Sequence, residues 1–249
     1  MCLRIHIIAC QVFSRELRHF AAVSPHIIDI TWLPQGLHDT PTILRSRLES
    51  AVLQIEDTPR NRPDFILFGY GLCSNGTMGV AARTIPIVIP RTDDCIGIFL
   101  GSQARYLALF NRYQTAYWLN NGWIENAFLP TPEALAEKKA EYTRLYGEDN
   151  AEYLAGEDVS WTKNYRYCGF IHSTVYHNDS YRALADRLCG LYGWEAVDLR
   201  GDCRMLEAMV GGQWDPQDFL VCPPGTWAQP SYDRQKMIAV PAKEEAANG

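Results

Sequence analysis

Short apolar runs alternate with amphipathic stretches through the first ninety residues of the chain. The runs are rich in β-branched and aromatic residues, and each ends at a turn or polar segment, which is typical of buried strands. They predict strands at residues 4–9, 27–33, 64–69 and 85–89. Apolar residues at helical spacing predict helices that begin near Ser14 and Thr40, a short helix at 78–83 and a longer one at 96–113.

This order of strands and helices predicts an α/β protein with a parallel, Rossmann-like sheet, because parallel strands need helical crossovers. The alternation then appears a second time, with strands expected at residues 167–171, 194–199 and 218–222. We therefore consider two pseudo-repeated βαβαβ lobes, at about 1–125 and 166–230, against a single α/β alternation without a repeat. Residues 126–165 are expected to form a helical connector, and the polar tail at 242–249 to be frayed.

Composition and charge narrow the class of protein. Hydrophobic residues make up 47% of the chain and charged residues 21%, as in ordinary globular proteins. The net charge of −6 disfavours binding to nucleic acid or to an anionic membrane, because both need a basic surface. No apolar segment has the length of a transmembrane helix or of the apolar core of a signal peptide. We expect a cytoplasmic protein.

Three of the eight cysteines follow predicted strands. Cys10 follows the first strand, Cys73 lies in the turn after the third, and Cys95 comes shortly after the fourth. Parallel strands place their carboxyl ends at one edge of the sheet, where ligands bind, so we expect these three thiols to share that edge. The alternative for any single cysteine is a small buried hydrophobic residue, and we assign Cys168, Cys189 and Cys203 to that role.

Other residues near the same edge are candidates for binding or catalysis. Gly71, Asn75 and Gly76 belong to a glycine-rich turn that allows a backbone to approach a ligand, and we predict that they bind a cofactor. The candidate catalytic residues carry charge or a titratable ring; they are Glu16, His38, Arg91 and Asp94.

Soft thiolate ligands select zinc, copper(I) or iron–sulfur clusters. The chain has no closely spaced Cys-x-x-Cys pair, which disfavours a zinc finger or ribbon. Three scattered thiolates suit an iron–sulfur cluster or a catalytic zinc with one position open to substrate. Cys222, at the end of another predicted strand, is an alternative fourth ligand.

Six stretches carry distinctive motifs. They are Ile-Ala-Cys at 8–10, Leu-Pro-Gln-Gly-Leu-His at 33–38, Gly-Tyr-Gly-Leu-Cys-Ser-Asn-Gly at 69–76, Asp-Cys-Ile with Leu-Gly-Ser within 94–102, Tyr-Gly-Glu-Asp-Asn-Ala at 146–151, and Phe-Leu-Val-Cys-Pro-Pro-Gly at 219–225. Together they resemble a family of bacteria and methanogenic archaea that is catalogued as a domain of unknown function.

The resemblance implies one family domain over residues 1–249, and it transfers no activity. Members often accompany corrinoid-dependent methyltransferases, which implies a corrinoid or methyltransferase partner. The family positions that match Cys10, Cys73 and Cys95 favour metal ligation, whereas an aliphatic residue is expected where this chain has Cys222.

Three functions remain open from the sequence. The first is an iron–sulfur protein of redox or methyl-group metabolism, and the second is a zinc–thiolate enzyme that acts on a substrate thiol. The third is a module that binds a small molecule or a corrinoid partner without catalysis.

Overall fold

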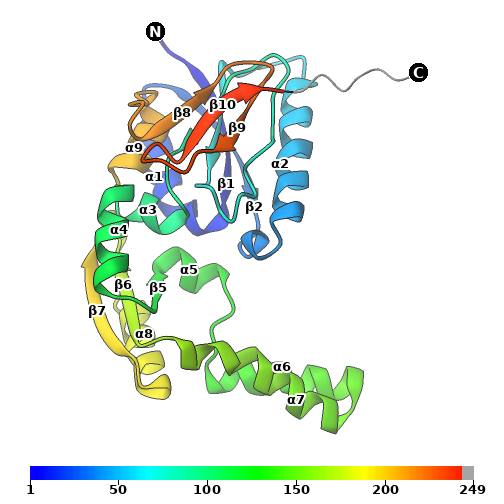
Figure 1. Ribbon diagram of the computed structural model, residues 1–249, viewed down its shortest axis with the longest axis vertical. Helices are drawn as coiled ribbons and strands as arrows, with labels where there is room; N and C mark the ends of the chain where they lie inside the picture. Colours follow the sequence, from blue (N-terminus) through cyan, green and yellow to red (C-terminus); the bar gives the residue numbers. More distant parts are fainter. Residues whose placement is uncertain (243–249) are drawn as a thin grey trace.

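The computed structural model describes residues 1–242, which form two α/β units, one above the other in the view of Figure 1. The predicted frayed tail at 242–249 lies outside the described residues except for Ala242. The predicted fold class, α/β with parallel sheets, is confirmed.

The first unit contains a sheet of five strands in the order β2-β1-β3-β4-β8, of which the first four are parallel. These strands are β1 (Arg4–Cys10), β2 (Ile27–Leu33), β3 (Phe65–Gly69), β4 (Ile87–Pro90) and β8 (Phe219–Cys222). The central strands are almost entirely buried, which explains their near-continuous apolar sequence. Its main helices are α1 (Ser14–Val23), α2 (Pro41–Glu56) and α9 (Arg204–Gly211).

The second unit is a smaller parallel sheet in the order β5-β6-β7. Its elements are β5 (Ala116–Asn120), β6 (Tyr167–His172), β7 (Glu195–Arg200), α5 (Asn121–Asn126), the short helix η3 (Trp161–Asn164) and α8 (Asp179–Tyr192). The sequence pattern did not predict β5, which is short and leads directly into α5.

The last predicted strand belongs to the first sheet. The lobe predicted at about 166–230 included residues 218–222 as its last strand, but β8 pairs with β4 and runs antiparallel to it. β8 covers the edge of β4 that would otherwise be left unpaired. A hairpin of β9 (Thr226–Pro230) and β10 (Met237–Pro241) packs over it. The second set of strands therefore does not form a separate βαβαβ lobe.

Two predicted helices differ from the structure. Residues 78–83 form turns with an isolated bridge at Ala81, because their backbone pairs with β9 instead of closing helical hydrogen bonds. The helix predicted at 96–113 is divided into α3 (Cys95–Phe99) and α4 (Gln103–Arg112). Gly101, with a φ of 73°, makes the break between them.

The predicted helical connector forms α6 (Pro132–Tyr146) and α7 (Glu148–Ser160), a hairpin that projects from the body of the molecule (Figure 1). Its surface is mostly solvated, as its sequence indicated. None of the helices in the described part of the chain is both long and apolar enough to cross a membrane.

Candidate functional site

The three cysteines that follow the predicted strands line a single cavity of about 780 Å³. Cys10 is the last residue of β1, Cys73 lies in the loop after β3, and Cys95 is the first residue of α3, after β4. The carboxyl edge of the parallel sheet brings them together, as expected for such a sheet. We call Cys10, Cys73 and Cys95 the cavity cysteines.

The loops that carry Cys73 and Cys95 are joined backbone to backbone. Leu72 N donates to Thr92 O at 2.8 Å, and Cys73 N donates to Asp93 O at 2.9 Å. Gly71 makes this approach possible, because a Cβ atom at this position would lie 2.5 Å from Thr92 O.

Cys73 opens a run of three residues with left-handed backbone. The φ angles of Cys73, Ser74 and Asn75 are 46°, 56° and 64°. For residues with a Cβ this conformation costs roughly 1–2 kcal/mol each, although asparagine tolerates it better than most. Left-handed non-glycine residues concentrate at functional sites, where the side chain is needed despite the cost. Two of the three, Cys73 and Ser74, line the cavity.

Tyr70 lies among the cavity cysteines. Its side chain is buried, and its hydroxyl makes no hydrogen bond of normal geometry within the described residues. Burial raises the pKa of Tyr70 well above its usual value, and the nearby thiols of Cys10 and Cys73 raise it further. The cavity therefore contains a buried polar atom that a ligand could satisfy.

Burial also keeps the three thiols protonated when no cation is present. It raises the pKa of Cys10 to about 11 and the pKa of Cys73 and Cys95 well above their ordinary value. Asp94, which lies beside both Cys73 and Cys95, adds to the upward pKa shift of each. A thiol of this kind is a poor free nucleophile, because the thiolate is the reactive form.

Asp94 is held by the start of α3. Its carboxylate accepts hydrogen bonds from Ile96 N at 2.8 Å and from the Tyr106 hydroxyl at 3.0 Å. Burial raises the pKa of Asp94, while these hydrogen bonds lower it. Asp94 therefore lines the cavity in a fixed orientation and caps the helix that begins at Cys95.

The opposite side of the cavity comes from the second unit. Gly122 of α5 packs against Val12, two residues after Cys10, so closely that a Cβ atom on Gly122 would lie 1.7 Å from Val12 O. This contact fixes the two units against each other beside the cysteines. Six aromatic side chains, which we call the aromatic wall, line this side: Tyr117, Trp118, Trp123, Phe128, Trp161 and Tyr165.

Comparison with protein families identifies the chain. A family model described as "Protein of unknown function (DUF1638)" matches residues 32–210. The chain belongs to this family. The match includes Cys73, Cys95 and the aromatic wall, while Cys10 and β8 lie outside the matched residues. No curated protein and no solved structure matches the chain.

Of the other predicted catalytic residues, His38 lies at the cavity and Arg91 does not. His38 lines the cavity, with its ring centroid 5.8 Å from that of Trp123. Arg91 is not among the lining residues, and its guanidinium donates to backbone oxygens of Pro216, Phe219, Gln235 and Met237. Its charge is used to hold β8 and β10 in place.

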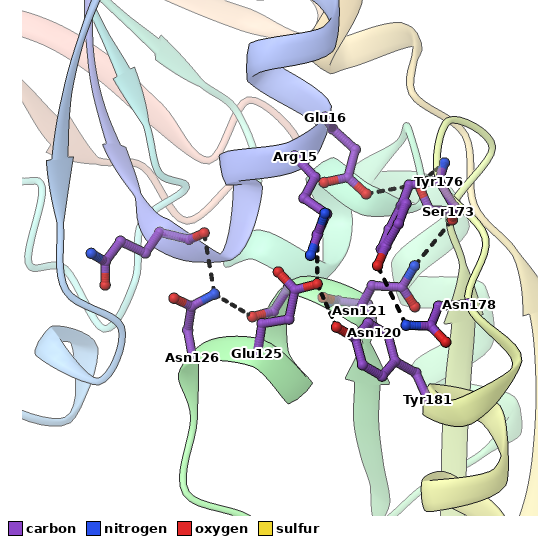
Figure 2. A network of polar contacts seen from close by, with 12 residues as sticks. Arg15, Glu16, Asn120, Asn121, Glu125, Asn126, Ser173, Tyr176, Asn178 and Tyr181 are labelled. Carbon is purple, nitrogen blue, oxygen red and sulfur yellow. Dashed lines mark hydrogen bonds and ion pairs between the residues drawn. The ribbon is translucent and has the colours of Figure 1, made fainter.

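The Glu16 side chain points towards Ser173 of the second unit (Figure 2). Its carboxylate accepts a hydrogen bond from Ser173 Oγ at 2.7 Å. Neighbouring Arg15 pairs with Glu125 and stacks over the ring of Tyr176, 4.1 Å from its centroid. This polar network joins α1 to α5 and to the segment after β6, so Glu16 links the two units and does not line the cavity.

The predicted cofactor-binding residues Gly71, Asn75 and Gly76 do not line the cavity. They belong to the loop that carries Cys73 and influence its conformation. Gly71 allows the contact with Thr92, and Gly76 packs against Leu44, where a Cβ atom would lie 2.7 Å from Cδ2. Asn75 is exposed, and its carbonyl accepts a hydrogen bond from Arg45. Their direct role in binding stays a prediction.

The remaining five cysteines lie elsewhere, and Cys2 is exposed near the start of the chain. Cys168 and Cys189 face each other across β6 and α8, Cys203 accepts a hydrogen bond from Thr174 at 3.1 Å, and Cys222 is buried in β8. None of these five lines the cavity.

Within residues 1–242, no three His, Cys, Asp or Glu side chains are grouped closely enough to hold a metal ion as they stand. Sequence reasoning missed Tyr70 and the aromatic wall. Tyr70 sits within the glycine-rich motif, which was a usable signal. The wall comes from elements whose packing the sequence pattern does not reveal.

Proposed function

We propose that the protein is a cysteine-ligated metalloprotein, with Cys10, Cys73 and Cys95 as ligands of an iron–sulfur cluster at the cavity. The observation that supports this is the convergence of three thiols, from three separate strand ends, on one cavity. Thiolates are the ligands that such clusters prefer in proteins.

The surroundings fit a thiolate-bound cofactor. The Tyr70 hydroxyl, buried without a normal hydrogen bond, would gain a partner in a cluster sulfide or a ligand thiolate. Binding would require the cysteine side chains to turn towards a common point, since they are not grouped closely enough in the described structure. It would also release the protons of the three thiols.

The proposed centre is open to small molecules. Three protein ligands leave one position unfilled, and a cavity of about 780 Å³ falls within the ordinary range of ligand pockets. When bound, the cluster would supply electron transfer or a Lewis-acidic iron. The chain itself would hold the cluster through the cavity cysteines and exclude water with the aromatic wall.

A zinc–thiolate enzyme is the second candidate. His38 lines the same cavity, and a set of sulfur ligands with one imidazole nitrogen suits zinc. Zinc would lower the pKa of a substrate thiol and so generate a nucleophile.

We extend the proposal to redox or methyl-group metabolism in the cytoplasm, with a small-molecule substrate or a corrinoid methyltransferase as partner. The eight cysteines are free, as expected in a reducing compartment. The corrinoid association rests on the family resemblance.

Anaerobic purification followed by iron, sulfide and zinc analysis tests the proposal. We expect iron with matching sulfide and broad visible absorption in the natural protein, and loss of both in Cys10→Ala, Cys73→Ala and Cys95→Ala. Stoichiometric zinc without colour would favour the second candidate.

Three of the other buried cysteines provide matched controls. Cys168→Ala, Cys189→Ala and Cys203→Ala should keep the metal, with stability losses on the order of 1 kcal/mol. Retention of metal in all three cavity variants, or its loss from a folded control variant, would contradict the ligand assignment.

A further inference from the structure

The charges that line the cavity have one sign. Its carboxylates come from Asp39, Asp93 and Asp94, and none of its lining residues is a lysine or arginine. Lys236 pairs with Asp93 at 2.9 Å from outside the lining. An anionic ligand would therefore meet carboxylates, one of which is paired with Lys236, whereas a cationic ligand would meet complementary charge at Asp39 and Asp94.

Three ring pairs of the aromatic wall stand at steep angles, while the ring planes of Tyr117 and Trp161 differ by 38°. The ring planes of Tyr117 and Trp123 differ by 83°, those of Tyr117 and Tyr165 by 72°, and those of Trp161 and Tyr165 by 86°. A flat ligand stacks best in a slot between parallel rings. Steeply inclined rings instead present faces and edges in several directions, as in the aromatic cages that bind methylated cations.

One ring of the wall already has a cation beside its face. The Lys138 ammonium lies 4.6 Å from the ring centroid of Phe128. Phe128 is thus a ring of the wall that already makes a cation–π contact.

We propose that the cavity binds a small organic cation whose charge is spread over methyl groups, such as a quaternary ammonium or sulfonium compound. The aromatic wall surrounds the methyl groups, and the carboxylates of the cavity favour the positive charge. Dispersed charge suits this site, since such a cation is weakly hydrated and loses little on leaving water for a ring face.

This inference deepens the proposed function and rests on it for the consequence of binding, since the cavity cysteines line the same space as the aromatic wall. Thiolates at these positions would add negative charge and strengthen the attraction for a cation. The binding itself depends on the rings and carboxylates, so it can be measured with and without metal.

The test compares choline with its uncharged carbon isostere, 3,3-dimethylbutan-1-ol, by titration calorimetry on the full chain. The two molecules have the same shape and differ in charge. We expect choline to bind at least about tenfold more tightly, as a desolvated cation–π interaction predicts. The anion 2,2-dimethylpropanoate should bind more weakly than both.

Trp123→Leu and Phe128→Leu remove a ring face while keeping an apolar side chain. Each should lower choline affinity about three- to tenfold and change the affinity for the isostere little. Phe128 is 43% exposed, so its replacement leaves the core intact. Phe110→Leu is the matched control, because Phe110 is similarly exposed but does not line the cavity.

Equal affinity for choline and its isostere, or choline binding that neither variant weakens, would overturn the inference. Charge-selective binding by metal-free protein, together with failure to bind any metal, would support the cation site and reject the metalloprotein. Metal binding without charge selectivity would reject the cation site alone.

Discussion

Gly71 and Thr92 touch so closely that a single added Cβ atom on Gly71 would lie 2.5 Å from the carbonyl oxygen of Thr92. This contact joins the loop of Cys73 to the loop that precedes Cys95. The position of one cavity cysteine relative to another therefore depends on the absence of a side chain between them.

Gly71→Ala should separate these loops. We expect a loss of about 1–3 kcal/mol in the free energy of unfolding, because backbone atoms of Thr92 and Asp94 must move. The variant should also bind less metal than the natural protein. Urea unfolding and metal analysis measure the two effects.

Gly156→Ala is the control for this substitution. Gly156 lies in α7, where an added Cβ atom meets nothing within 4 Å, so the change should stabilise the helix by about 0.5–1 kcal/mol. Equal unfolding free energies and metal contents for the two alanine variants would show that the approach of Gly71 to Thr92 is unimportant.

Asn75 has a left-handed backbone, with a φ of 64°. We therefore expect glycine at this position to give a more stable protein than alanine. Asn75→Gly should leave the unfolding free energy within about 0.5 kcal/mol, since glycine adopts this conformation freely. Asn75→Ala should lower the free energy of unfolding by roughly 1 kcal/mol, because the left-handed conformation is less favourable for alanine than for asparagine. Denaturant titration of both variants checks this order, and an Asn75→Ala variant as stable as Asn75→Gly would contradict it.

The buried carboxyl group of Glu16 should make the free energy of unfolding depend on pH. Burial raises the pKa of its carboxyl group, and the charge of Glu125 adds to this, while Ser173 and Arg15 oppose it. Cys203 is a further titratable neighbour. Between the ordinary and the raised pKa, the folded state binds more protons than the unfolded state, so this group makes stability fall as pH rises through that window.

Glu16→Gln should remove this component, because glutamine does not titrate. Urea unfolding across the acid range should show a smaller fall in stability with rising pH for the variant than for the natural protein. Parallel pH profiles for the two proteins would mean that Glu16 does not titrate differently on folding.

The strand-end cysteines could be located from sequence because of a general property of parallel sheets. Buried strands have recognisable apolar runs, and their carboxyl ends meet at one edge. Cys10, Cys73 and Cys95 follow such runs, so local pattern was sufficient to place them at one cavity.

The pattern of apolar runs does not show where a side chain points or which distant segments pair with each other. Glu16 is close to Cys10 in sequence, but α1 directs its carboxylate to Ser173 in the second unit. Arg91 follows β4, a strand of the site. Its guanidinium, however, donates hydrogen bonds to backbone oxygens of Pro216 and Phe219, around the start of β8. Trp123 reaches the cavity only because Gly122 lets α5 pack against Val12.

X-ray absorption at the metal edge of anaerobically purified protein tests the metal assignment most directly. We expect a first shell dominated by sulfur, at about 2.3 Å for a thiolate-bound metal, and its loss in Cys73→Ala. A first shell of nitrogen and oxygen alone, or a natural protein that binds neither iron nor zinc when both are supplied, would contradict it.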